Sequence, residues 1–153
     1  MVQYEIKIHS VHTRHLAVVR QRLKRSDLGA NLISFLDRVY AQVHAGKVVQ
    51  NGQNVFVYKD GTQDHITVEV GVEVSGPFED VEDVIYASTP SGEVVSTLHI
   101  GPYSNLGRAY DALSQWCREH HRTQANICWE VYGDWEEDPT KLQTEVFCLL
   151  QSG

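Results

Sequence analysis

Apolar and polar residues alternate over several short segments of the chain, which is the pattern of half-buried β-strands. Two longer segments instead repeat apolar residues at three- and four-residue steps, which predicts amphipathic helices. The first helix follows a capping signal at Ser26-Asp27 and stops near Gly46, and the second follows Gly101-Pro102 and runs to Cys117. The predicted strands are residues 4–8, 14–23, 53–59, 65–74, 84–88, 93–100, 127–135 and 143–150.

The second half of the chain repeats the plan of the first. Asp27-Leu28-Gly29 matches Asn105-Leu106-Gly107 at the head of each helix, and Val57-Tyr58-Lys59-Asp60 matches Val131-Tyr132-Gly133-Asp134. Their shared order and spacing indicate an internal duplication. We therefore expect a single α+β domain over residues 1–153, made of two strand–helix–strand–strand halves at about 4–78 and 84–150. The halves should form antiparallel sheet with both helices on one side and a ligand cleft between them.

Composition and charge narrow the possible functions. The chain has 153 residues, of which 42% are hydrophobic, and it carries 20 acidic against 13 basic residues for a formal charge of −7. This charge disfavours direct binding to nucleic acid or anionic membranes and favours cationic molecules or a basic protein surface. No segment has the length and apolarity of a membrane span or the character of a signal peptide, so we expect a cytoplasmic location.

The cysteines give a further expectation. Cys117, Cys128 and Cys148 lie far apart in the sequence, and their number is odd. This pattern argues against a disulfide framework and against a cysteine-based zinc site, and it fits a reducing compartment.

One predicted strand carries an acid among aromatic residues. Because side chains alternate along a strand, Cys128, Glu130 and Tyr132 share one face, and Trp129 lies on the other, which we expect to face the helices as core. A carboxylate between aromatic residues is costly to bury unless a partner satisfies it. A pocket role for Glu130 is therefore weighed against the alternative of a solvated residue on an exposed strand.

The duplication supplies a comparison for Glu130. Aligning Tyr58 with Tyr132 places Phe56 opposite Glu130, so the fold does not require an acid at this position. The alternative to a pocket role for Tyr58 and Tyr132 is that both are ordinary half-buried residues of the sheet. Tyr103 and Trp135 lie at the ends of elements and are candidates for the rim of a cavity. The predicted ligand-binding residues are Glu130, Tyr132, Tyr58, Phe56, Tyr103 and Trp135.

Other chemistry finds less support in the sequence. No nucleophile elbow, phosphate loop or dinucleotide fingerprint is present, so we assign no catalytic residue and expect no cofactor. The histidines lack partners at ligand spacing, which argues against a metal site. For His99 we expect a structural hydrogen bond to the turn that follows it.

Several motifs together resemble a known family. His99-x-Gly101-Pro102-Tyr103, a helix that ends near Trp116, Glu130-x-Tyr132 and a closing Thr144-Glu145-Val146 strand are similar to the GyrI-like small-molecule-binding family. This family includes the effector-binding domain of BmrR- and Rob-type transcription regulators. The resemblance implies that Glu130 lies in an aromatic-lined cavity and contacts lipophilic cations.

The resemblance also frames the function. No DNA-binding segment precedes the first predicted strand, so we expect the stand-alone form, which sequesters or senses drugs or toxins. One alternative is a hydrolase of reactive xenobiotics, such as cyclopropane-containing toxins, that uses Glu130. Another is an acidic inhibitor of a larger protein partner such as DNA gyrase. Whether the protein is an enzyme stays open at this stage.

Overall fold

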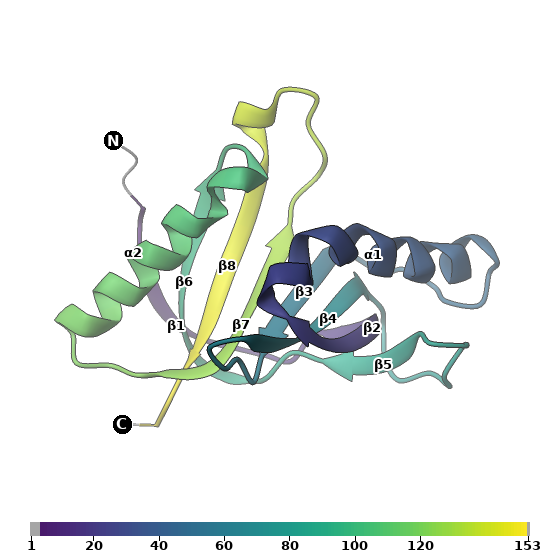
Figure 1. Ribbon diagram of the computed structural model, residues 1–153, viewed down its shortest axis with the longest axis horizontal. Helices are drawn as coiled ribbons and strands as arrows, with labels where there is room; N and C mark the ends of the chain where they lie inside the picture. Colours follow the sequence, from purple (N-terminus) through teal and green to yellow (C-terminus); the bar gives the residue numbers. More distant parts are fainter. Residues whose placement is uncertain (1–3, 153) are drawn as a thin grey trace. The chain divides into compact units, whose positions relative to one another are not determined.

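The computed structural model describes residues 4–152, which form eight strands, two α-helices and three short 3-10 turns (Figure 1). The strands confirm the predicted α+β class, and most bounds lie within a residue or two of those expected. The first strand is shifted toward the C-terminus, and the strand that carries Glu130 ends at Tyr132. The elements are β1 (Lys7–Val11), β2 (His15–Lys24), α1 (Leu28–His44), β3 (Asn54–Lys59), β4 (His65–Glu73), β5 (Ile85–Ser88), β6 (Gly92–Ile100), α2 (Leu106–Glu119), β7 (Gln124–Tyr132) and β8 (Gln143–Leu150).

The chain divides into two compact units. We call residues 13–90 the central unit, and residues 1–12 together with 91–153 the terminal unit. The central unit holds antiparallel strands in the order β5-β2-β4-β3, and the terminal unit holds them in the order β1-β6-β8-β7. Each unit therefore has its own four-stranded arrangement and its own helix.

The first strand of each half of the sequence pairs with a strand from the other half. β1 starts the chain but pairs with β6, and β5 follows β4 in the sequence but pairs with β2. The compact units therefore do not coincide with the expected halves, 4–78 and 84–150, which stay a prediction about the repeat. Each unit does contain the expected strand–helix–strand–strand order, as β2-α1-β3-β4 and β6-α2-β7-β8.

The heads of the two helices are built alike. Each helix begins at the matched leucine, Leu28 or Leu106, directly after a 3-10 turn at Arg25–Asp27 or Tyr103–Asn105. The capping signal correctly located the start of α1, but the Asp27 side chain makes no capping hydrogen bond. The position of each helix start is therefore set by the turn that precedes it.

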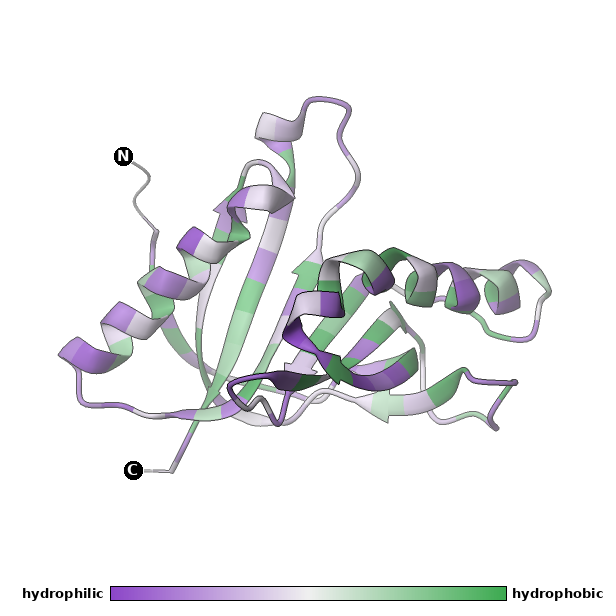
Figure 2. Ribbon diagram, viewed as in Figure 1, coloured by the Kyte–Doolittle hydropathy of each residue, from purple (hydrophilic) through white to green (hydrophobic). Residues whose placement is uncertain are grey.

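Each helix packs against its own unit. α1 contacts β2 and β4, and α2 contacts β6 and β8. In Figure 2 hydrophobic and hydrophilic residues alternate along the ribbon of α2, because only one side of this helix is buried. The core beneath α2 contains Val95, Leu106, Ala109, Leu113, Cys117, Val146, Cys148 and Leu150.

The side-chain direction of β7 differs from the prediction. Trp129 is a core residue, as expected, but its ring stacks on Phe147 with centroids 5.6 Å apart, on the sheet face opposite the α2 core. Cys128 and Tyr132 are the residues that pack with that core. The expectation that Trp129 faces the helices was wrong, because alternation separates the two faces of a strand but does not say which one a helix covers.

The cysteines also depart from the prediction. Cys128 and Cys148 form a disulfide across β7 and β8, and Cys117 is a buried free thiol. The expected absence of a disulfide was wrong because the spacing of cysteines along the chain does not show which strands become neighbours. Among the described residues, no helix is long and apolar enough to cross a membrane.

A glycine in β4 allows the close packing of the central unit. A Cβ atom added to Gly71 would lie 1.7 Å from the carbonyl oxygen of Ala17 in β2. We expect Gly71→Ala to lower the free energy of unfolding by about 3 kcal/mol or more, because the backbone of β2 would have to move. Urea denaturation followed by circular dichroism measures this change.

The control substitution is Gly29→Ala in α1, where no heavy atom lies within 4 Å of the added Cβ. It should raise the free energy of unfolding by up to about 1 kcal/mol, since alanine favours the helix. Equal effects of the two substitutions would contradict the observed pairing of β2 with β4.

Candidate functional site

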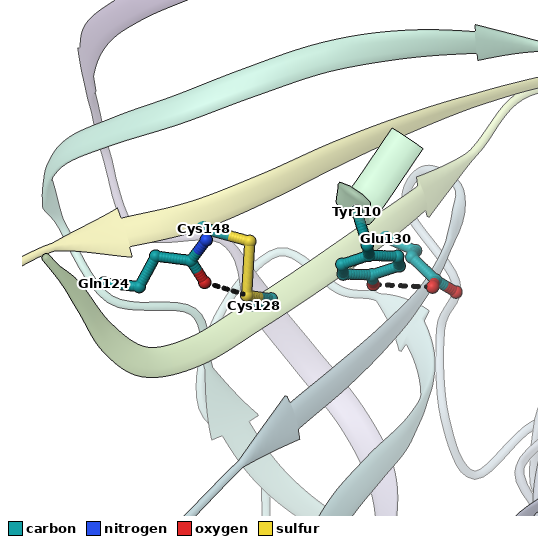
Figure 3. The surroundings of a disulfide bond; sticks show 5 residues. All are labelled: Tyr110, Gln124, Cys128, Glu130 and Cys148. Atoms are coloured by element: carbon teal, nitrogen blue, oxygen red, sulfur yellow. Dashed lines mark hydrogen bonds between the residues drawn. A yellow bond between two sulfur atoms is a disulfide. The ribbon is translucent and has the colours of Figure 1, made fainter. Parts of the chain in front are cut away.

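The carboxylate of Glu130 is the centre of the candidate site. Glu130 is only 4% exposed, and its Oε2 accepts a hydrogen bond of 2.6 Å from the hydroxyl of Tyr110 (Figure 3). Its Oε1 accepts a hydrogen bond from the hydroxyl of Tyr132. The solvated alternative for Glu130 is therefore excluded, and both carboxylate oxygens are satisfied by phenols, as a buried acid requires.

Local structure explains how the two phenols reach the carboxylate. Tyr132 lies two positions after Glu130 on β7, so both side chains lie on the same face. Tyr110 follows the buried Ala109 on α2 and lies at the edge of the core that this helix covers. Phenols are neutral donors, so these two hydrogen bonds satisfy carboxylate oxygens without bringing a positive charge of their own.

A further aromatic ring leads from this cluster toward the surface. Tyr103, in the 3-10 turn before α2, meets the ring of Tyr132 edge to face with centroids 5.3 Å apart. Tyr103 is 41% exposed, and partial burial raises the pKa of its phenol above the usual value near 10. Tyr103, Tyr132, Glu130 and Tyr110 thus form a continuous row from the surface to the buried acid.

Trp135 occupies a different kind of position. It is 74% exposed and lies in the loop between β7 and β8. The same loop borders a polar depression lined by Gly133, Asp134, Glu136, Lys141 and Gln143. The structure thus places Trp135 at an element end, as predicted, but on an exposed loop rather than in the buried cluster.

Phe56 and Tyr58 belong to the central unit. Both lie on β3, where Phe56 is 6% exposed and Tyr58 is half-buried. They share the face of Asn54, whose side chain accepts a hydrogen bond from Tyr40 of α1. Phe56 therefore lies on the helix-covered face of its strand, as Glu130 does in the terminal unit. The expected cleft to which both would contribute stays a prediction.

His99 fixes the entry to α2. Its Nε2 lies 3.0 Å from the carbonyl oxygen of Pro102, and its Nδ1 lies 2.8 Å from the hydroxyl of Tyr4. Because a carbonyl can only accept, Nε2 must donate. The predicted hydrogen bond from His99 to the following turn is confirmed. It holds the segment that leads directly to Tyr103.

The sequence pattern did not identify the partner of one buried acid, Glu130, or the second buried acid, Glu69. Tyr110 was not among the predicted site residues, although a buried phenol generally needs a hydrogen-bond partner. Glu69 in the central unit is 1% exposed and is bound by Arg20 at 2.5 Å and Lys59 at 3.1 Å. The hydroxyl of Tyr110 could have indicated a buried polar partner for this residue. The partners of Glu69 could not be predicted, because they depend on which strands pair and in which register.

Metal binding finds no donor set in the part of the chain that the structure describes. Within residues 4–152, no group of three histidine, cysteine, aspartate or glutamate side chains is placed to hold a metal ion.

Comparison with known proteins identifies the family. Residues 4–151 match the family model described as the GyrI-like small molecule binding domain. The chain belongs to this family. It is therefore a small-molecule-binding domain of the GyrI-like type. A comparison with curated protein sequences found no match.

Solved structures share the fold at low sequence identity. The EcmrR C-terminal domain is 16% identical, with a TM-score of 0.78 over 99% of this chain and 100% of that one. SAV2435 bound to tetraphenylphosphonium is 10% identical, with a TM-score of 0.68 over 99% and 95% of the two chains. A hydrolase encoded by lin2189 from Listeria innocua is 11% identical, with a TM-score of 0.61 over 96% and 92%.

The hydrogen bond from Tyr110 to Glu130 predicts a stability effect. Tyr110→Phe removes one donor from a buried carboxylate, so we expect the free energy of unfolding to fall by about 1–3 kcal/mol. Chemical denaturation of both proteins at neutral pH measures the difference.

Tyr103→Phe is the matched control, because it removes the same hydroxyl from a residue that is 41% exposed. Its effect should stay within about 0.5 kcal/mol. A loss from Tyr110→Phe that is no larger than this would show that the phenol does not stabilise the buried acid.

Proposed function

We propose that this domain binds small lipophilic organic cations, with Glu130 as the charged anchor. The buried carboxylate carries the proposal, because it is held by phenols in an aromatic setting rather than exposed to water. A desolvated anion attracts an organic cation more strongly than a solvated one does. Tyrosine faces add cation–π attraction to the same ligand.

The row of tyrosines suggests which residues contact the ligand. Tyr132 adjoins both the acid and Tyr103, so these two rings would contact a ligand that reaches Glu130 from the surface. Trp135 is the proposed rim residue on the neighbouring loop. Phe56 and Tyr58, the predicted ligand contacts on β3, stay predictions.

Two further observations support a cationic ligand. The formal charge of −7 favours the approach of cations over that of anions. A protein of the same fold, SAV2435, has been solved with tetraphenylphosphonium, which is a lipophilic cation. We propose that the domain sequesters or senses such compounds in the cytoplasm. Direct nucleic-acid binding is not part of this proposal.

The substitution Glu130→Gln tests the charged anchor. It keeps the shape of the side chain but removes its charge and replaces one acceptor oxygen with an NH2 donor. We therefore expect tetraphenylphosphonium to bind about 10- to 100-fold more weakly. Isothermal titration calorimetry gives both dissociation constants. Tetraphenylborate, an anion of similar shape, should bind the unmodified protein far more weakly than tetraphenylphosphonium does.

The matched control is Glu145→Gln, which removes the same charge from an exposed residue on the opposite face of the sheet. It should leave the dissociation constant for tetraphenylphosphonium within about twofold, since exposed charges are screened by salt. Equal affinities of Glu130→Gln and the unmodified protein would remove Glu130 from the site.

A hydrolase is the second candidate, favoured by the same buried acid and by the Listeria innocua hydrolase of this fold. Glu130 would then hold a water against a strained electrophile. In that case, incubation with cyclopropane-containing compounds should give a product larger by one water in mass spectrometry. Glu130→Gln should abolish this product, and recovery of unchanged compound from both proteins would contradict hydrolysis of this compound class.

A further inference from the structure

The terminal unit holds a pair of sulfur atoms close to the Glu130 cluster. Cys128 on β7 and Cys148 on β8 are partners in the strand register and form a disulfide (Figure 3). Cys128 lies two positions before Glu130, so both side chains lie on the face that α2 covers. The disulfide and the acid are therefore neighbours on one strand.

The helix above them contacts both features. Cys148 belongs to the same buried core as Leu113 and Cys117 of α2, and Tyr110 of this helix donates to Glu130. These three helical positions are spaced by three and four residues, so they lie along one side of α2. A change in the packing around the sulfur atoms would thus reach Tyr110 through a single rigid helix.

We propose that Cys128 and Cys148 form a redox-active site that exchanges with small thiols and disulfides of the glutathione class. We further propose that its oxidation state sets the ligand affinity of the Glu130 site. This second part rests on the proposed function. Disulfides in reducing compartments are usually transient and regulatory, which fits a domain that acts in the cytoplasm.

The burial of the two sulfurs determines the order of the exchange. Cys148 is fully buried and Cys128 is half-buried, so a glutathione thiolate attacks the sulfur of Cys128. The Cys128–Cys148 bond breaks, and Cys148 leaves as a thiolate that takes up a proton. A second glutathione thiolate then releases Cys128 from the mixed disulfide. Overall, two molecules of glutathione become one glutathione disulfide, and the protein gains two thiols.

The structure accommodates the reduced state as well. Gln124 Oε1 lies 3.6 Å from the sulfur of Cys128 (Figure 3), where it can accept a hydrogen bond from a thiol. Reduction of the disulfide disturbs the packing, because two separate thiols need more room than a bonded pair in a close-packed core. We expect α2 to yield, which loosens the contact of Tyr110 with Glu130 and opens the acid to a ligand.

The first measurement concerns the sulfur chemistry alone. The protein is equilibrated in glutathione buffers from oxidising to reducing, alkylated and weighed by mass spectrometry. We expect a reversible transition that adds two alkylated thiols, and the same transition in Cys117→Ala. A disulfide that resists reduced glutathione in the folded protein would overturn the proposal and show a structural cross-link only.

The second measurement concerns the coupling. Tetraphenylphosphonium should bind the reduced protein about tenfold more tightly than the oxidised protein, as judged from the cost of overpacking. In Cys128→Ser/Cys148→Ser the affinity should no longer depend on the buffer. Equal binding to the oxidised and reduced protein would overturn the coupling and leave the proposed function intact.

A third readout separates the two proposals when neither form binds the probe. In that case the proposed function fails, but the coupling is still visible in the carboxyl ¹³C signal of Glu130, recorded in both redox states of the unmodified protein. A shift between the states supports coupling between the sulfur pair and the acid. Identical signals overturn it.

Discussion

Burial of the Glu130 carboxylate is the constraint on which the terminal unit depends. An acid with 4% exposure must receive hydrogen bonds, and its donors come from β7 itself and from α2. The position of α2 is therefore tied to the acid by a polar contact as well as by the apolar core. The hydrogen bond of 2.6 Å adds a directional contact to the close-packed core and so favours one register of the helix.

The two buried glutamates of the chain are held in different ways. Glu69 is bound by Arg20 and Lys59, so its charge is compensated within the central unit. Tyrosine hydroxyls donate to Glu130, and they satisfy its oxygens without adding a positive charge. The donors described for the two acids thus differ in kind: cationic groups bind Glu69, and phenols donate to Glu130.

The sequence predicted local features well and tertiary partners poorly. Helix starts at Leu28 and Leu106 and the last strand follow from short-range periodicity, and the structure confirms them. The facing of Trp129 and the disulfide of Cys128 depend on which strands and helices become neighbours, which no local pattern states. The same reason explains why the sequence singled out Glu130 but not Tyr110, its partner from another element.

The pairing of β1 and β5 could not be predicted from the repeat pattern of the sequence. Since β1 pairs with β6 and β5 with β2, neither sequence half can complete its own sheet. At the point where these connections leave the central unit, Thr89 and Arg14 are joined by two hydrogen bonds of 2.8 and 3.1 Å. Each unit therefore draws its strands from both expected halves of the sequence. In the alignment of the two predicted halves, Phe56 and Glu130 occupy matching positions on β3 and β7, so the predicted repeat does not require an acid there.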